Sequence, residues 1–409
     1  MTIITKVLTS DGARQSFTIN DGFGDKTING EKLLALPGLI DPHVHFRVPG
    51  MEYKEDWVTG AKAAFKGGYS VVFDMPNTQP ATTTQQRLID KINIIDNQIK
   101  NSGLPLKYKL FFGADKNNFQ EIEKVKDSIV GIKVFMGSST GELLMDDLSS
   151  LHAVYALAKA FNLTIALHAE DELIIQENTQ KYALETDFKY HSIIRSVDAA
   201  VRAVTTVIQL VKTYGVKSYI LHLSSFEEIE LVKQAKLAGL PIFAETCPHY
   251  LFLDDSMYDE LQGLGKMNPP LRNKVHQDYL WQAVADGVID TIGSDHAPHT
   301  LDEKQQPLCK CPSGVPGIET TLPLMLTAYK QGKVSLDRLI GLLHDNPQRI
   351  FNLEPQNNWV LANIVDYKPL TNDKLCTKSK WSPYAGMNLT GYPEYFISNN
   401  RLINLQNLE

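Results

Sequence analysis

The stretch LIDPHVHFR, residues 39–47, begins as an apolar run and ends in two histidines and an arginine. A short apolar run of this kind is typical of a buried strand. Side chains alternate along a strand, so His43 and His45 project from the same side, about 6.6 Å apart along the chain. Two imidazoles at that spacing can bind one metal ion, although an isolated His-x-His more often marks ordinary hydrogen-bonded histidines.

Seven further apolar runs follow, separated by helical patterns such as EDWVTGAKAAFKGG and EEIELVKQAKLAG. The runs are YSVVFDMPN, YKLFFGAD, IVGIKVFMG, LTIALHAE, SYILHLSS, LPIFAET and VIDTIGSDH. This alternation predicts an α/β fold, a (β/α)₈ barrel of the TIM type over residues 37–354, with a doubly wound sheet as the alternative. The barrel is favoured because nearly every run ends in His, Asp, Asn, Lys or Glu. A barrel brings all strand ends to one rim, where active sites lie.

The two ends of the chain have a different pattern. Residues 1–36 contain short strand-like pieces such as IITKVLT and RQSFTI, and residues 355–409 contain NWVLANIVDY and EYFISNNRLIN. We expect the two ends to pair into one small composite β-domain beside the barrel.

Composition limits the function classes. The 409 residues are 43% hydrophobic, which is enough for a substantial core, and the net charge is -7. Because lysines and arginines are scattered, the chain offers no basic stripe for a nucleic acid. A leader pattern and a long apolar stretch are both missing, which indicates a cytoplasmic protein without a membrane span. A homodimer is the default expectation for such a protein.

The 4 cysteines are too sparse for a disulfide frame, so we expect reduced thiols. Cys309 and Cys311 are separated by one residue, closer than in the usual metal-binding pair, and no second pair follows.

The ends of later runs change the interpretation of the first one. His168, His222 and Asp295 occupy positions equivalent to His43 and His45. Nitrogen and oxygen donors in this number suit zinc, with manganese, iron or cobalt as substitutes. His249, at the end of the seventh run, could replace His222 as a ligand; we favour His222.

Lys133 ends the fourth run, where an ordinary ammonium would repel a dication. It could be a salt-bridged or substrate-binding lysine. A buried lysine beside cations instead has a lowered pKa and becomes nucleophilic when neutral, and carboxylation would convert it into an anionic carbamate able to bridge two metals.

Several motifs together carry a family resemblance. They are DPHVHFRVPG, FDMPNT, GIKVFMGSSTG, LHAE, LHLSS, MNPPLR and GSDHAPH. Over nearly its full length the chain resembles the dihydroorotases, cyclic amidohydrolases of the amidohydrolase superfamily. The resemblance implies two Zn²⁺ per chain, bridged by N6-carboxylated Lys133 and bound by His43, His45, Lys133, His168, His222 and Asp295. Some family members have an aspartate where Lys133 stands or bind only one metal well.

The resemblance also implies an activity and a small-molecule substrate. Dihydroorotases reversibly cyclise N-carbamoyl-L-aspartate to L-dihydroorotate with loss of water, in de novo pyrimidine (UMP) biosynthesis. A metal-bridged hydroxide would be the nucleophile in the hydrolytic direction, and Asp295 would be the proton shuttle. Arg47, Asn77 and His299 would bind the substrate carboxylate, and Asn268 would contact the ring amides.

Two other functions stay open. An allantoinase or hydantoinase would share the metal ligands, although Arg47, MNPPLR and His299 favour a dihydroorotase. A catalytically inactive scaffold relative would be expected to have lost ligands, and all candidates are present. Residues 137–144 and 300–317 are two loops that could move when substrate binds.

Overall fold

The computed structural model describes residues 1–20, 25–138 and 143–408. At its centre is an 8-stranded sheet in which each strand pairs in parallel with the next along the chain. The strands are β5 (Leu39–Val44), β6 (Tyr69–Asp74), β7 (Lys107–Gly113), β8 (Gly131–Phe135), β9 (Ile165–His168), β10 (Ser218–Ile220), β11 (Ile242–Thr246) and β12 (Thr291–Ile292). A bridge between Val44 and His296 joins the last strand to the first. The sheet is therefore a nearly closed barrel, which confirms the predicted fold over the doubly wound alternative.

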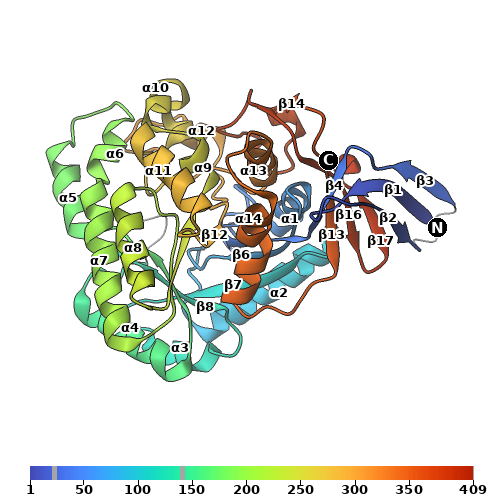
Figure 1. Cartoon of the computed structure of the whole chain (residues 1–409). Coiled ribbons are helices and arrows are strands. Elements are labelled where there is room, and N and C mark those ends of the chain that lie inside the picture. The colour runs from blue at the N-terminus through green and yellow to red at the C-terminus, as the bar shows by residue number, and fades with distance from the viewer. Residues whose placement is uncertain (21–24, 139–142, 409) are drawn as a thin grey trace.

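Helices surround this barrel (Figure 1). They are α1 (Trp57–Lys66), α2 (Gln85–Ser102), α3 (Phe119–Val125), α4 (Leu148–Phe161), α5 (Glu172–Lys181), α6 (Tyr190–Ile194), α7 (Val197–Tyr214), α8 (Phe226–Leu237), α9 (Pro248–Phe252), α10 (Tyr258–Leu261), α11 (Lys274–Ala285), α12 (Leu301–Lys304), α13 (Thr321–Lys330), α14 (Leu336–Ile340) and α15 (Asn346–Ile350). Shorter helical turns are η1 (Asp255–Met257), η2 (Gln262–Gly265), η3 (Gly341–Asp345), η4 (Asn372–Lys374) and η5 (Leu405–Asn407).

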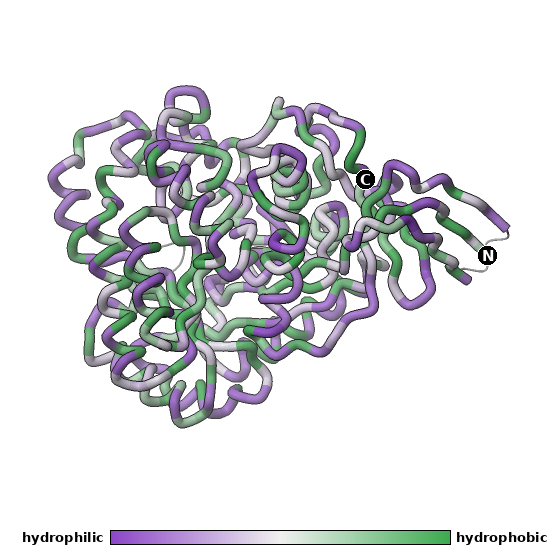
Figure 2. The backbone as a smooth tube through the Cα atoms, in the orientation of Figure 1, coloured by the Kyte–Doolittle hydropathy of each residue, from purple (hydrophilic) through white to green (hydrophobic). Residues whose placement is uncertain are grey.

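Local sequence signals set the ends of these helices. The Ser196 side chain accepts from the amide of Ala199 at the start of α7, and Gly215 ends that helix with a φ of 67°. At the start of α8, Ser225 and Glu228 form a reciprocal capping box. These caps satisfy amides and carbonyls that a helix end leaves unpaired. Green and purple alternate along the outer helices in Figure 2, as expected where one face packs on the barrel and the other meets solvent.

The barrel strands bury both of their faces. Ile165 and Leu167 of β9 belong to the large core between strands and helices, whereas Ala166 belongs to a separate cluster with Phe111 and Tyr219. Neighbouring residues of a strand point to opposite faces, so this second cluster fills the inside of the barrel. The side chains at the carboxyl ends of the strands remain available for the site.

A second sheet combines the two ends of the chain. Its order is β17-β16-β13-β4-β1-β2, and β3 pairs with β1. The strands are β1 (Thr2–Leu8), β2 (Arg14–Ile19), β3 (Lys26–Asn29), β4 (Leu33–Pro37), β13 (Asn358–Asn363), β16 (Tyr392–Ser398) and β17 (Arg401–Asn404). Figure 1 shows these blue and red strands side by side at the right of the barrel. The predicted pairing of both ends into a small β-domain is confirmed, while the exact domain boundaries stay a prediction.

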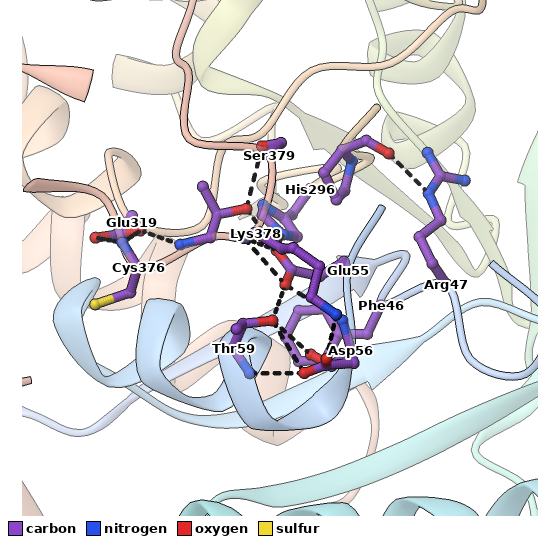
Figure 3. Close-up of polar contacts among 12 residues, drawn as sticks. Phe46, Arg47, Glu55, Asp56, Thr59, His296, Glu319, Cys376, Lys378 and Ser379 are labelled. Atoms are coloured by element: carbon purple, nitrogen blue, oxygen red, sulfur yellow. Dashed lines mark hydrogen bonds and ion pairs between the residues drawn. The ribbon is translucent and has the colours of Figure 1, made fainter. Parts of the chain in front are cut away.

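The C-terminal part also returns to the barrel. Between β14 (Lys368–Pro369) and β16, the chain forms β15 (Asn388–Leu389) and a segment that contacts the loop before α1 and the loop after β12. The amides of Cys376 and Thr377 donate to the Glu319 carboxylate at 2.9 and 3.1 Å, and the Lys378 amide donates to Glu55 at 3.2 Å (Figure 3). The indole of Trp381 donates to the carbonyl of His299 at 2.7 Å. These hydrogen bonds hold the C-terminal segment against the loops at the carboxyl ends of the barrel strands.

Of the candidate moving loop 137–144, residues 139–142 lie outside the described residues. Among the residues that are described, no helix combines the length and apolar character needed to cross a membrane.

Candidate metal centre and active site

A cavity of about 360 Å³ lies at the carboxyl ends of the barrel strands. Every predicted site residue except His299 lines it: His43, His45, Arg47, Asn77, Lys133, His168, His222, Asn268 and Asp295. Phe135, Ala297, Ser313 and Gly314 complete the wall. His299 lies behind this lining and contacts both Arg47 and Ser313. The structure thus brings all the predicted residues to one place.

Three of these residues form a compact group of ligand atoms. Nε2 of His43 and Nε2 of His45 lie 3.3 and 3.2 Å from Oδ1 of Asp295. The opposite ring nitrogens are occupied, because Nδ1 of His43 lies 2.7 Å from Glu245 and Nδ1 of His45 lies 2.8 Å from Asn77. An acceptor at Nδ1 fixes the tautomer and leaves Nε2 unprotonated for a metal.

The remaining two histidines face each other beside this group. Nδ1 of His168 lies 3.0 Å from Nε2 of His222, and Nε2 of His168 lies 2.9 Å from the Glu170 carboxylate. Nδ1 of His222 is buried and has no hydrogen-bond partner among the described residues. The ring centroid of His222 is 5.4 Å from that of His43, so the two groups are continuous.

The geometry and protonation of these residues fit a divalent metal. Two ligands of one tetrahedral zinc lie about 3.3 Å apart, given zinc–nitrogen distances near 2.0–2.1 Å. The ligand pairs here lie 3.0 to 3.3 Å apart. Burial lowers the pKa of His45 to about 3 and also lowers the pKa of His168 and of His222. These histidines are therefore neutral at neutral pH, as metal binding requires.

Lys133 projects into the same cavity from the middle of β8. Its ammonium lies 4.5 Å from the ring centroid of Phe135. Burial lowers the pKa of Lys133 to about 7, so an appreciable fraction of this side chain is a neutral amine at neutral pH. A neutral amine is the form that reacts with carbon dioxide, which fits the predicted carbamate.

Arg47 forms the polar end of the cavity, at the end of β5. Its Nε donates to the carbonyl of Pro298 at 3.1 Å, the dashed line that leaves Arg47 in Figure 3. Its Nη2 lies 3.1 Å from Nε2 of His299. Burial lowers the pKa of Arg47 to about 10, so it stays protonated at neutral pH. Within the described parts of the chain, no carboxylate lies at ion-pair distance from this guanidinium. A buried and unpaired cation of this kind favours an anionic ligand.

Asn268 and the loop after β12 form another part of the cavity wall. Oδ1 of Asn268 is buried without a hydrogen-bond partner among the described residues, so it can accept from a ligand. The ammonium of Lys304 donates to the carbonyls of Lys266, Pro312 and Gly314, all at 2.9 Å. These bonds tie the predicted moving loop 300–317 to the wall that carries Asn268. Movement of the loop on ligand binding stays a prediction.

Backbone conformation gives a further sign of function. Arg47, His222 and Asp295 have φ angles of 65, 43 and 43°. Residues other than glycine seldom adopt positive φ, and such strain concentrates at functional sites. All three residues occur where a barrel strand ends and its side chain turns into the cavity.

His249, the alternative ligand, occupies a different place. It lies on α9, packs its ring 4.2 Å from that of Tyr250 and does not line the cavity. Both of its ring nitrogens are buried without a partner among the described residues, and burial lowers its pKa to about 4. Its position favours His222 as the ligand.

The sequence interpretation missed the residues that hold the histidines in place. Glu245 binds His43 and also accepts from the Tyr219 hydroxyl at 2.6 Å. Glu170 binds His168 and accepts from Nε of Arg195 at 2.9 Å. The available signal was the glutamate that ends LHAE and the one that precedes the last residue of FAET, since a buried acid near a strand end needs a partner.

Comparison with known proteins agrees with this geometry. The profile of the amidohydrolase family matches residues 34–356. A dihydroorotase of Methanosarcina acetivorans is 34% identical over 93% of this chain and 83% of its own length. A dihydroorotase of Bacillus licheniformis is 31% identical over 93% of this chain and 89% of its own. The L-hydantoinase of Arthrobacter aurescens superposes with a TM-score of 0.89 at 26% identity, covering 98% of this chain and 96% of that one.

The chain therefore belongs to the amidohydrolase family. Within that family its curated relatives place it with the dihydroorotases, as the motifs predicted.

Proposed function

We propose that this protein catalyses the reversible cyclisation of N-carbamoyl-L-aspartate to L-dihydroorotate with loss of water. The observation that carries the proposal is the buried, unpaired guanidinium of Arg47 beside the His43–His45–Asp295 group. A ligand for this cavity needs an anion next to the bond that reacts. A carboxylate attached to a cyclic amide meets that requirement, and the dihydroorotases among the relatives act on such a ring.

We propose that the metal ligands are His43, His45, carboxylated Lys133, His168, His222 and Asp295, with two Zn²⁺ per chain. The spacing of the imidazole nitrogens and the low pKa of Lys133 support this assignment. When bound, such metals activate water at neutral pH and polarise the carbonyl that is attacked.

Asp295 is the proposed proton shuttle. Oδ1 of Asp295 lies 3.3 and 3.2 Å from the Nε2 atoms of His43 and His45, and a metal held by these imidazoles would favour the ionised form of the carboxyl group. The carboxylate is therefore ionised and can accept the proton of the attacking water. As the ring carbon–nitrogen bond breaks, Asp295 delivers that proton to the departing amide nitrogen. The cyclisation uses the same two transfers in reverse order.

The other cavity residues bind and orient the ring. Arg47 offers a planar, two-pronged donor to the substrate carboxylate. Oδ1 of Asn77 already accepts from His45, so its amide group is the part that can donate to the same carboxylate. Oδ1 of Asn268 can accept from a ring N–H, and His299 completes the carboxylate pocket from behind Arg47.

A hydantoinase or allantoinase is the second candidate, favoured by the superposition on an L-hydantoinase. Hydantoin has no carboxylate, so it would leave Arg47 buried and without an anion. An inactive scaffold role is opposed by the assembly of all the predicted ligands around one cavity. Metal content near zero, in protein purified without chelator, would revive it.

The deciding experiment compares ring opening of L-dihydroorotate, hydantoin and allantoin by the ultraviolet absorbance of the ring amide. We expect dihydroorotate to be opened at least about 100-fold more efficiently, because the other rings leave Arg47 without its charged partner. Equal or faster opening of hydantoin or allantoin would overturn the proposal. Arg47→Met should raise KM for dihydroorotate and leave the slow reaction with hydantoin unchanged.

We further propose a cytoplasmic homodimer that serves pyrimidine biosynthesis. The relatives support the reaction, and two-fold symmetry is the commonest arrangement of soluble enzymes. Sedimentation at several protein concentrations measures the oligomeric state.

A further inference from the structure

Lys54 has no part in the activity described so far, yet it reaches the back of the carboxylate pocket. It lies in the loop between β5 and α1 and is 6% exposed. Its ammonium is 3.0 Å from Nδ1 of His299 and 2.9 Å from Oε1 of Glu303. The loop residue beside it, Tyr53, is 61% exposed and donates to the same glutamate at 3.2 Å. Lys54 therefore connects a surface acid to a buried imidazole.

His299 is placed between two cations that can only donate hydrogen bonds. Lys54 faces its Nδ1 at 3.0 Å, and Nη2 of Arg47 faces its Nε2 at 3.1 Å. Burial, followed by the charge of Arg47, holds the pKa of His299 well below its usual value, so the ring is neutral. A neutral imidazole has one donor and one acceptor nitrogen, and it can accept from only one of the two cations.

The surrounding acceptors decide which nitrogen carries the proton. The carbonyl of Ser313 lies 3.2 Å from Nε2 and can accept a hydrogen bond from it. On the other side the Glu303 oxygen is 3.6 Å from Nδ1, beyond hydrogen-bond distance. A proton on Nδ1 would also point at the Lys54 ammonium. The proton therefore belongs on Nε2, and Nδ1 accepts from Lys54.

We propose that Lys54 is a positioning residue that selects the Nε2–H tautomer of His299 and thereby makes His299 a donor to the substrate carboxylate. With this tautomer, two donor nitrogens, Nε2 of His299 and Nη2 of Arg47, stand 3.1 Å apart, and the only acceptor near Nε2 among the described contacts is the Ser313 carbonyl at 3.2 Å. A substrate carboxylate placed against both donors removes their repulsion and accepts one charge-assisted hydrogen bond from each of them. This inference rests on the proposed function, because it concerns the carboxylate of that substrate.

The loss of Lys54 reverses this arrangement. In Lys54→Met, Nδ1 loses its donor and can carry the proton toward Glu303, which has lost its ionic partner. Nε2 then accepts from Arg47 and no longer offers an N–H to the substrate carboxylate. We expect KM for L-dihydroorotate to rise about 10- to 100-fold, the range of one hydrogen bond to a charged group, while kcat changes little.

Three further variants separate this role from simple support of the loop. Lys54→Arg keeps a pure donor and should restore much of the wild-type KM. Glu303→Gln removes the partner of the ion pair but leaves Lys54 facing Nδ1, so it should raise KM less than Lys54→Met does. Tyr53→Phe removes only the surface hydrogen bond and should behave like the wild type. Equal effects of Lys54→Met and Glu303→Gln would show that the pair acts only as structural support and would overturn the proposal.

Nitrogen NMR of the protein labelled in histidine reads the tautomer directly, with the His299 signal assigned from its loss in His299→Asn. The expected result is a proton on Nε2 in wild type and in Glu303→Gln, and on Nδ1 in Lys54→Met. Succinate, a plain dicarboxylate, should shift the wild-type signal and not that of Lys54→Met. The same tautomer in all proteins would overturn the inference. Failure of the wild type to open dihydroorotate would overturn the proposed function alone.

Discussion

The two ends of the barrel both contain hollows, and the larger one is at the end without the predicted site. At the amino ends of the strands, a hollow of about 1100 Å³ is lined by residues such as Lys107, Asp127 and Phe351. Lys107 and Asp127 are exposed, so water solvates their charges. The cavity at the carboxyl ends has only about 360 Å³, but it contains buried Arg47 and Lys133.

The difference shows that the exclusion of water from charged side chains, and not the volume of the hollow, marks the end of the barrel where the predicted site lies. Removal from water lowers the pKa of Lys133 to about 7 and that of Arg47 to about 10. Burying charged groups close together costs free energy, so proteins keep such groups mainly at sites where they have a function. In barrel enzymes that place is the rim at the carboxyl ends of the strands.

Asp295→Asn should have the largest effect on activity. The amide keeps the shape of the carboxylate but cannot shuttle a proton, so kcat should fall about 10²- to 10⁴-fold while much of the metal stays bound. Initial rates together with metal analysis measure both quantities. Asp127→Asn at the opposite end is the matched control and should retain full activity. Near-normal turnover of Asp295→Asn would remove the proposed shuttle.

If Lys133 is the proposed carbamate ligand, Lys133→Ala should empty at least one metal site per chain and lower the rate by about 10²-fold. Acetate or propionate should restore part of the rate by occupying the space of the carbamate. Metal content per chain, measured by atomic emission with and without these acids, tests the prediction. Lys107→Gln provides the control at the other end. Two bound metals and an unchanged rate in Lys133→Ala would disprove the bridge.

Phe351→Ala should affect stability and not catalysis. This ring closes the amino end of the barrel and lies 4.9 Å from Phe73 and 5.1 Å from Tyr219, centroid to centroid. Its removal should lower the free energy of unfolding by about 3 to 5 kcal/mol, as for other buried aromatic residues. Urea unfolding and KM for dihydroorotate should be measured on the same protein. A large change in KM without loss of stability would contradict the division between the two ends.

Glu245→Gln should have the smallest of these effects. The amide can still contact His43, but the charge that favours the Nδ1–H tautomer is gone. Metal affinity should weaken about 10- to 100-fold, the usual effect of changing a residue that holds a metal-binding histidine. Competition with a chromophoric chelator measures the affinity. An unchanged affinity would show that His43 keeps its orientation without the carboxylate.

Much of the fold could be predicted because its signals are local. Each apolar run contains one barrel strand, and the helix patterns after Glu55 and Phe226 became α1 and α8. The metal-type residues could also be predicted, since His43, His168 and His222 each stand near the C-terminal end of an apolar run. The C-terminal segment that contacts Glu319 was expected only in the small sheet, because its contacts with the rim have no local pattern.

By itself, the sequence determined the alternation of strands and helices and the chemistry at the strand ends. Both follow from periodicity and residue type within short stretches of chain. Only the tertiary structure decided how the side chains are held, because that depends on contacts between distant residues. Lys54 meets His299 and Glu303, and His43 meets Glu245, only after the barrel closes between Val44 and His296. A hydrogen bond depends on distance and direction in space, and separation along the chain does not specify either.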